Sequence, residues 1–307
     1  MKIGLMLPLG ENERLGRPLP FGHLRAMAVA ADEHGLDSVW GADHLLFREE
    51  GVTEGIHECW TVLTAVAAVT RRVQVGPLVL ALPFRNPALT AKMAAALDEV
   101  SGGRLVLGIG CGWHEPEFEA FGYPFSHRVG RFEEAIEILG PMLRTGRADF
   151  AGRWHAARDA ELLPRGPREQ GPPILIAGKG PRMLRLVARH ADWWNAAWYG
   201  VPEEATELDE RIARLREACD AEGRDPATLT LTAGIFVHFP GLEQDEEPPE
   251  RAIAGDPDGV GRAMAGYREH GIEHLIVHCW PRSPAAVEAL AEAAHVVRAS
   301  AAEPAIR

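Results

Sequence analysis

Short apolar runs alternate along the chain with longer stretches in which apolar residues recur at helical spacing. The runs have the length and composition of strands buried on both faces of a parallel sheet. The longer stretches carry the 3.6-residue stripe of a helix that packs on one side. The predicted strands are residues 2–7, 37–40, 73–82, 105–109, 174–177, 193–197, 229–238 and 274–279. The predicted helices are residues 24–31, 58–70, 87–100, 129–143, 182–190, 203–222, 257–270 and 285–299.

Strands alternating with helices from one end to the other predict an α/β fold of the closed (β/α)8 barrel type. A doubly wound sheet is the structural alternative. The alternation pauses only over residues 146–172, which are rich in Arg, Gly and Pro. We expect an excursion there, before the fifth strand, with a hairpin around Gly152. Residues 1–307 are therefore expected to form one domain, with the active site at the carboxyl ends of the strands.

The fourth strand ends in a run of alternating glycines, Gly108, Gly110 and Gly112. Bare backbone at these points allows either a large flat ligand or a closely packed helix to approach. Trp113 and His114 follow on the loop that leaves the strand. A strand end of this kind is typical of the wall of a site.

Other strand ends collect further candidate chemistry. Asp43 and His44 follow the second strand. A lone histidine in a loop usually makes only a local contact. An aspartate and a histidine side by side at a barrel strand end favour a functional role instead. Lys179 stands between Gly178 and Gly180, just before a helix that begins at Pro181. Free N–H groups, the helix dipole, Lys179 and Arg182 would converge there on an anion such as phosphate. The remaining candidates at strand ends are Asn195, Trp198, His278 and Trp280.

Composition narrows the class of protein. The formal net charge of -12 argues against nucleic acid as a general partner. No apolar run has the length of a membrane span, and the first residues do not resemble a signal peptide. The four cysteines match no zinc or CxxC spacing, so we expect reduced thiols, no metal site and a cytoplasmic location.

Several segments together resemble the luciferase-like monooxygenase superfamily. They are residues 37–44 (DSVWGADH), 83–87 (PFRNP), 97–105 (LDEVSGGRL), 107–113 (LGIGCGW), 128–134 (RVGRFEE), 173–180 (PILIAGKG) and 188–195 (ARHADWWN). They occur in the family's order and cover roughly residues 1–200.

The resemblance implies a barrel that binds reduced FMN or the deazaflavin F420, usually as a homodimer. It places Asp43 and His44 near the reactive ring as catalytic residues, and a non-proline cis peptide at Leu78–Val79 behind it. Residues 178–180 match the family's phosphate loop. In the sugar-phosphate dehydrogenases of this branch a glutamate stands where this chain has Trp113, which argues against such a substrate. The cofactor-binding set is completed by Gly110, Gly112, Pro181 and Asn195, and the expected substrate pocket comprises Trp113, His114, Trp198, His278 and Trp280.

Three functions remain open from the sequence. The first is an F420-dependent oxidoreductase that moves a hydride between deazaflavin C5 and a small apolar or aromatic substrate. The second is an FMNH2-dependent monooxygenase that activates O2. The third is a barrel that binds flavin or F420 without catalysis, against which the intact Asp43, His44 and glycine loop count.

Overall fold

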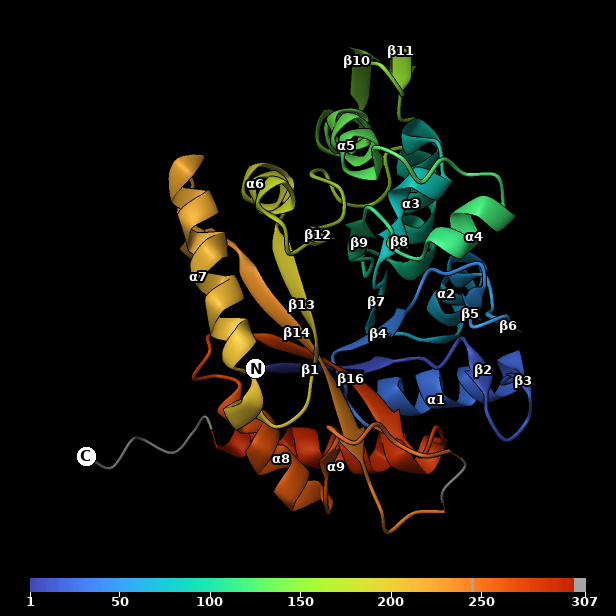
Figure 1. Ribbon diagram of the computed structural model, residues 1–307, viewed down its shortest axis with the longest axis vertical. Helices are drawn as coiled ribbons and strands as arrows, with labels where there is room; N and C mark the ends of the chain where they lie inside the picture. Colours follow the sequence, from blue (N-terminus) through green and yellow to red (C-terminus); the bar gives the residue numbers. More distant parts are fainter. Residues whose placement is uncertain (244–245, 301–307) are drawn as a thin grey trace.

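A ring of parallel strands forms the centre of the computed structural model, which describes residues 1–243 and 246–300 (Figure 1). Neighbouring strands follow the order β7, β4, β1, β16, β14, β13, β12, β9 and β8. Their bounds are β1 Lys2–Met6, β4 Ser38–Gly41, β7 Gln74–Pro77, β8 Leu80–Ala81, β9 Leu107–Gly110, β12 Ile174–Ala177, β13 Trp193–Tyr199, β14 Thr230–His238 and β16 His274–Trp280. The predicted α/β barrel is confirmed.

The third predicted strand is broken in two. Residues 73–82 were expected to be continuous, but β7 and β8 are separated by Leu78 and Val79. The ring closes between β7 and β9, where the Val106 N–H donates to the Val75 carbonyl at 2.9 Å. Gly76 makes this approach possible, because a Cβ there would lie 2.4 Å from the Val106 carbonyl oxygen. With β7 and β8 taken as one strand, the described residues form an eight-stranded barrel.

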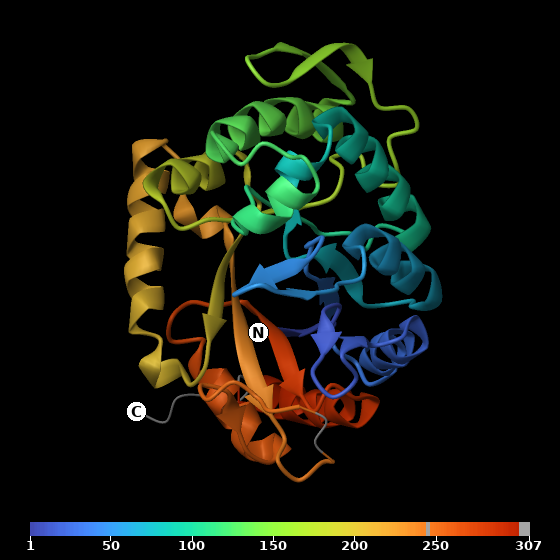
Figure 2. The ribbon, with the colours of Figure 1, turned by 45° about the vertical axis from the view of Figure 1, so that its right-hand side comes forward.

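Helices surround the strands as an outer layer (Figure 2). Local sequence explains their limits, as in α3, where Asn86 caps the first turn, Pro87 begins it, and Gly102 ends the helix with φ +66°. No helix in the described ranges has both the length and the apolar character needed to cross a bilayer. The helices are α1 Phe21–Glu33, α2 Cys59–Val69, α3 Pro87–Ser101, α4 Glu115–Ala120, α5 Arg128–Thr145, α6 Pro181–His190, α7 Thr206–Ala221, α8 Pro257–Gly266 and α9 Pro284–Ala299.

Most of the core lies between the strands and this helical layer. A smaller cluster fills the barrel itself, with Met6, Trp40, Leu78, Val106, Leu175 and Ile276. Next to it the Trp40 indole N–H donates to the Ser38 hydroxyl at 2.7 Å, and that hydroxyl is 2.8 Å from His274 Nε2. The barrel interior is therefore packed, and a wide opening for ligands lies towards the carboxyl ends of the strands.

Short hairpins lie outside the barrel sheet. The predicted excursion contains one, formed by β10 Arg147–Ala151 and β11 Ala156–Glu161, which projects beside α5 (Figure 1). A second hairpin, β5 Phe47–Glu49 with β6 Val52–Glu54, lies near α4. The remaining short elements are β2 Glu11–Asn12, β3 Arg17–Pro18, β15 Ile253–Ala254 and the 3-10 turns η1 Leu82–Phe84, η2 Pro202–Glu204 and η3 Pro226–Thr228.

Candidate active site

A cavity of about 750 Å³ opens at the carboxyl ends of the barrel strands. Its volume lies in the range of sites that hold small molecules and cofactors. The structure brings most of the predicted site residues to its wall: Asp43, His44, Leu78, Val79, Gly110, Gly112, Trp113, Gly178, Lys179, Asn195, Trp198 and His278. Four predicted residues, Gly180, Pro181, His114 and Trp280, are not part of the wall.

His44 is held by an acidic residue that is distant in sequence. Its Nδ1 lies 3.0 Å from Glu117 Oε1, and the Leu45 N–H donates to the other carboxylate oxygen at 2.8 Å. The Glu117 side chain is only 1% exposed. Glu117 comes from α4, whose neighbour Phe118 is fully buried against Phe84. The sequence predicts only that acids favour the start of this helix, so it does not identify Glu117 as the partner.

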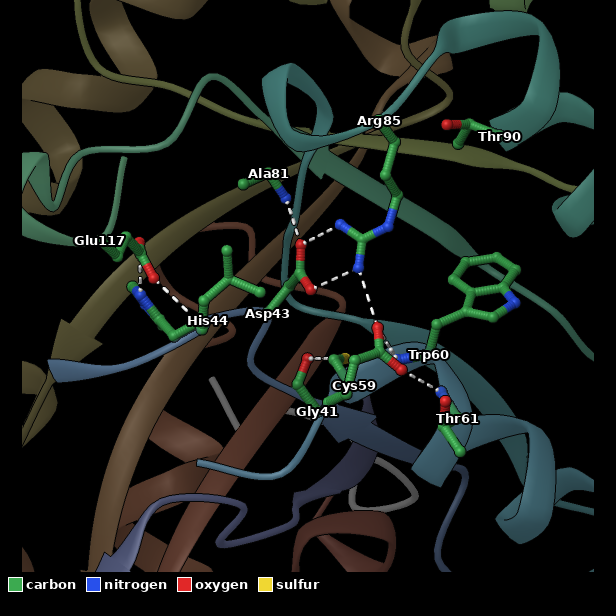
Figure 3. Close-up of polar contacts among 12 residues, drawn as sticks. Gly41, Asp43, His44, Cys59, Trp60, Thr61, Ala81, Arg85, Thr90 and Glu117 are labelled. Atoms are coloured by element: carbon green, nitrogen blue, oxygen red, sulfur yellow. Dashed lines mark hydrogen bonds and ion pairs between the residues drawn. The ribbon is translucent and has the colours of Figure 1, made fainter. Parts of the chain in front are cut away.

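Asp43, the other residue predicted to be catalytic, forms a buried ion pair with Arg85. Its two carboxylate oxygens accept hydrogen bonds from the Arg85 guanidinium at 2.6 and 2.9 Å, and one of them also accepts the Ala81 N–H at 2.8 Å. Figure 3 shows the Arg85 guanidinium facing the Asp43 carboxylate. Arg85 in turn donates to Glu58, the N-cap of α2. Burial disfavours the charge on Arg85, but the bonds to Asp43 outweigh it and raise the pKa of the guanidinium. Asp43 is therefore held by Arg85 and Ala81 at the cavity wall, and its catalytic role stays a prediction.

The break between β7 and β8 forms part of the cavity wall. The Leu78–Val79 peptide is cis, as the resemblance implies. The Leu78 N–H donates to the Gly41 carbonyl at 2.7 Å, and the Ala81 bond to Asp43 holds the far side of the break. Both ends are thus tied to the segment that carries His44.

The alternating glycines admit neighbouring protein atoms. A Cβ on Gly108 would lie 2.1 Å from the Pro77 carbonyl oxygen, and one on Gly110 would lie 2.7 Å from a Val79 methyl group. On Gly112 it would meet the Phe118 ring at 2.6 Å. Gly110 and Gly112 do line the cavity, but their missing side chains are required by close packing. Close packing of neighbouring protein atoms therefore explains the alternating glycines, and a ligand lying against bare backbone does not.

The predicted phosphate loop lies between β12 and α6. Gly178 and Lys179 reach the cavity, while Gly180 and Pro181 are exposed where α6 begins. A Cβ on Gly180 would meet nothing within 4 Å, so the backbone there is open. Arg182 does not converge on the loop as expected, because it forms an ion pair with Glu133.

Aromatic residues form two other parts of the site. Trp113 is 59% exposed at the rim, and its ring centroid is 5.6 Å from that of His44. On the opposite strands, Trp198 lies 4.8 Å from the His278 ring. Desolvation by burial, with a smaller effect of nearby Arg282, lowers the pKa of His278 to about 3.

Two of the predicted pocket residues lie behind the wall. His114 is buried, and its Nε2 accepts the Arg48 N–H at 2.9 Å, so it fastens β5 to the start of α4. Trp280 packs behind His278 with ring centroids 5.8 Å apart. The expectation that both face a substrate is wrong because each ring is covered by neighbouring elements.

The cavity also has polar residues that the strand ends do not predict. Arg211 from α7 donates to the Tyr199 hydroxyl at 2.7 Å and pairs with Glu207. Arg282, which follows β16, pairs with Glu246 at 2.6 Å. Cys111 has its pKa raised by burial and stays a thiol. In the described part of the chain no cluster of His, Cys, Asp and Glu has a geometry suited to a metal ion.

A family model described as luciferase-like monooxygenase matches residues 1–252. The chain belongs to the luciferase-like monooxygenase family. Luciferase-like relatives include an F420-dependent glucose-6-phosphate dehydrogenase of Amycolatopsis mediterranei, 37% identical over 293 residues that cover 82% of this chain and 86% of the relative. A phthiodiolone/phenolphthiodiolone dimycocerosates ketoreductase of a Mycobacterium strain is 32% identical, covering 88% of this chain and 75% of the relative.

Solved structures show the same luciferase-like barrel. An F420-dependent secondary alcohol dehydrogenase in complex with an F420-acetone adduct aligns with a TM-score of 0.77 at 20% identity, covering 97% of this chain and 99% of that one. A monooxygenase from Streptomyces bottropensis aligns with a TM-score of 0.77 at 23% identity, covering 95% and 98%. At these identities the likeness is evidence for the fold alone.

Proposed function

We propose that this luciferase-like enzyme is an F420-dependent oxidoreductase that transfers a hydride between deazaflavin C5 and a small apolar or aromatic substrate. The observation that carries the proposal is His44 at the wall of a cavity that also contains the Leu78–Val79 break and Lys179. It is supported by relatives named as F420-dependent dehydrogenases at 30% to 37% identity. When bound, the deazaflavin supplies the hydride chemistry, and the protein supplies binding and orientation.

The residues present fit such a cofactor. Leu78, Val79 and Ala177 offer an apolar wall to a flat ring, in a cavity of about 750 Å³. The exposed backbone at Gly180 and the Lys179 ammonium suit a phosphate at the rim. Asn195 of β13 also reaches the cavity, so these proposed cofactor-binding residues come from the β7–β8 break, from β12 and the loop after it, and from β13.

His44 would exchange the proton that accompanies hydride transfer. His44 is the cavity-lining histidine beside Trp113 and Phe47, and its ring nitrogens can accept and donate a proton. His278 suits this task less, since with a pKa of about 3 it is neutral at every physiological pH. The Trp113 and Phe47 rings beside His44 would shield the exchange from water.

The lining favours an uncharged substrate. Trp113 and Trp198 present aromatic faces to the cavity, and Trp113 stands where the resemblance implies a glutamate in sugar-phosphate dehydrogenases. Arg211 and Arg282, the cations of the far wall, are balanced by Glu207 and Glu246. A phosphorylated sugar would have to compete with these ion pairs.

Titration of the purified protein with F420 and with FMN, followed by O2, tests the proposal. We expect saturable binding of F420 and no O2 consumption during turnover. Binding of FMN with O2 uptake would favour the monooxygenase instead, and cofactor binding without turnover of any carbonyl or alcohol would favour a non-catalytic barrel.

We also propose that the protein is a cytoplasmic homodimer. The four cysteines are thiols, which agrees with a reducing compartment. Size-exclusion chromatography with light scattering should give twice the mass of one chain.

A further inference from the structure

The most sharply defined contact of the cavity wall is the pair formed by His44 and Glu117. An ionised carboxylate only accepts hydrogen bonds. Because Glu117 Oε1 lies 3.0 Å from His44 Nδ1, that nitrogen must carry the proton. Nε2 is then the atom left for the cavity, either as a proton acceptor or, in the imidazolium, as a donor.

We infer that Glu117 is a positioning residue that fixes the Nδ1–H tautomer of His44 and balances the charge that His44 acquires when Nε2 takes a proton. The tautomer follows from the 3.0 Å contact with an ionised Glu117. Its value for turnover rests on the proposed function.

The burial of both side chains strengthens the effect of Glu117 on the tautomer of His44. The side chain of Glu117 is 1% exposed and that of His44 is 14% exposed, so water competes little for the bond. Hydrogen bonds to a carboxylate are also stronger than neutral ones. Since the Leu45 N–H occupies the second oxygen at 2.8 Å, the carboxylate cannot rotate without losing a bond to backbone.

The elements that carry the two residues are themselves fixed. Phe118, next to Glu117, is fully buried and packs on Phe84 and Phe125. On the other side, Asp43 is clamped by Arg85. The pair is therefore held from α4 and from the end of β4, as its place in Figure 3 shows.

Other ionisable groups near His44 are already committed. The His114 ring lies 6.5 Å away, and its Nε2 accepts the Arg48 N–H. Asp43 and Arg85 pair with each other, and Arg85 also with Glu58. Glu117 is the acidic group whose carboxylate contacts the His44 ring, at 3.0 Å.

The isosteric change Glu117→Gln tests the inference sharply. An amide has one acceptor and one donor group, whereas His44 Nδ1–H and Leu45 N–H both donate. If the amide oxygen serves Leu45, its NH2 faces Nδ1 and forces the Nε2–H tautomer. We expect kcat to fall on the order of 10²–10⁴-fold, with the affinity for F420 unchanged.

Two changes serve as comparisons. Glu117→Asp keeps the charge and both acceptors, so it should retain the Nδ1–H tautomer and recover part of the lost turnover. Glu119→Gln removes the same charge from an exposed position on the same helix and should leave turnover and its pH profile unchanged.

Nitrogen-15 NMR of the cofactor-free protein gives a readout that does not depend on activity. The His44 ring signals are assigned as those that disappear in His44→Asn. We expect Nδ1–H in the wild type and Nε2–H in Glu117→Gln. An Nε2–H wild type would overturn the inference even if the variant fails to fold, and so would an active Glu117→Gln enzyme with an unaltered pH profile. Failure of the wild type to bind F420 would instead overturn the proposed function, while the tautomer would still be decided.

Discussion

His44 carries the sharpest prediction at the scale of single residues. His44→Asn keeps a side chain of similar size but cannot exchange a proton, so turnover should fall roughly 10²–10⁴-fold, the usual contribution of a positioned acid–base group. Affinity for F420 should change little. Steady-state kinetics together with fluorescence titration of the cofactor would measure both quantities.

His278 is the natural control. Its lowered pKa of about 3 means that it gains a proton only in strong acid, so activity between pH 5 and 9 should show no inflection due to this residue. His278→Asn should therefore act mainly on substrate KM. A larger loss of kcat in His278→Asn than in His44→Asn would reverse the two assignments.

Lys179 is the second prediction at this scale. A charge-assisted contact to phosphate is worth about 1.5–3 kcal/mol, so Lys179→Ala should weaken F420 binding markedly and slow saturated turnover little. Arg185→Ala removes an exposed cation from the following helix and serves as the control. Equal cofactor affinity in the wild type and Lys179→Ala would make Lys179 an ordinary surface residue.

At the scale of elements, the ion cluster of Asp43, Arg85 and Glu58 joins four of them. Asp43 follows β4, Arg85 follows η1, and Glu58 caps α2, while Ala81 of β8 donates to Asp43. Arg85→Met would leave the Asp43 carboxylate, only 1% exposed, without its counter-ion. Removing one partner of a buried pair costs about 3–5 kcal/mol, so the free energy of unfolding in urea should fall by that order.

The control for this change is the exposed pair of Arg214 and Glu210, in which both side chains are more than half exposed. Arg214→Met should alter the unfolding free energy by at most about 0.5 kcal/mol. Comparable losses in the two variants would show that the cluster at Asp43 has no special structural weight.

At the scale of the whole molecule, barrel closure predicts one cooperative unit over residues 1–307. Leu5 of β1 pairs with Val277 of β16, so the first and last strands are neighbours. A cut in the β10–β11 excursion would separate halves that each expose two unpaired strand edges. Limited proteolysis should therefore nick the hairpin without releasing stable fragments, and two folded halves separable near residue 150 would refute the single domain.

The sequence determined the order of the elements, because the periods of 2 and 3.6 are local properties of a chain. The same pattern determined which residues stand at the strand ends, and so placed His44, Lys179 and His278 around one opening. The hairpin around Gly152 was expected from the pause in this alternation over residues 146–172 and from their Arg-, Gly- and Pro-rich composition.

Tertiary structure alone decided how these residues are partnered. Glu117 is 73 positions from His44 and Arg85 is 42 positions from Asp43. Gly110 of β9 and Gly112 after it leave room for Val79 and Phe118, and the buried His114 accepts the Arg48 N–H. No local period encodes such contacts, since they arise only when barrel closure and helix packing bring distant segments within hydrogen-bond and van der Waals distance.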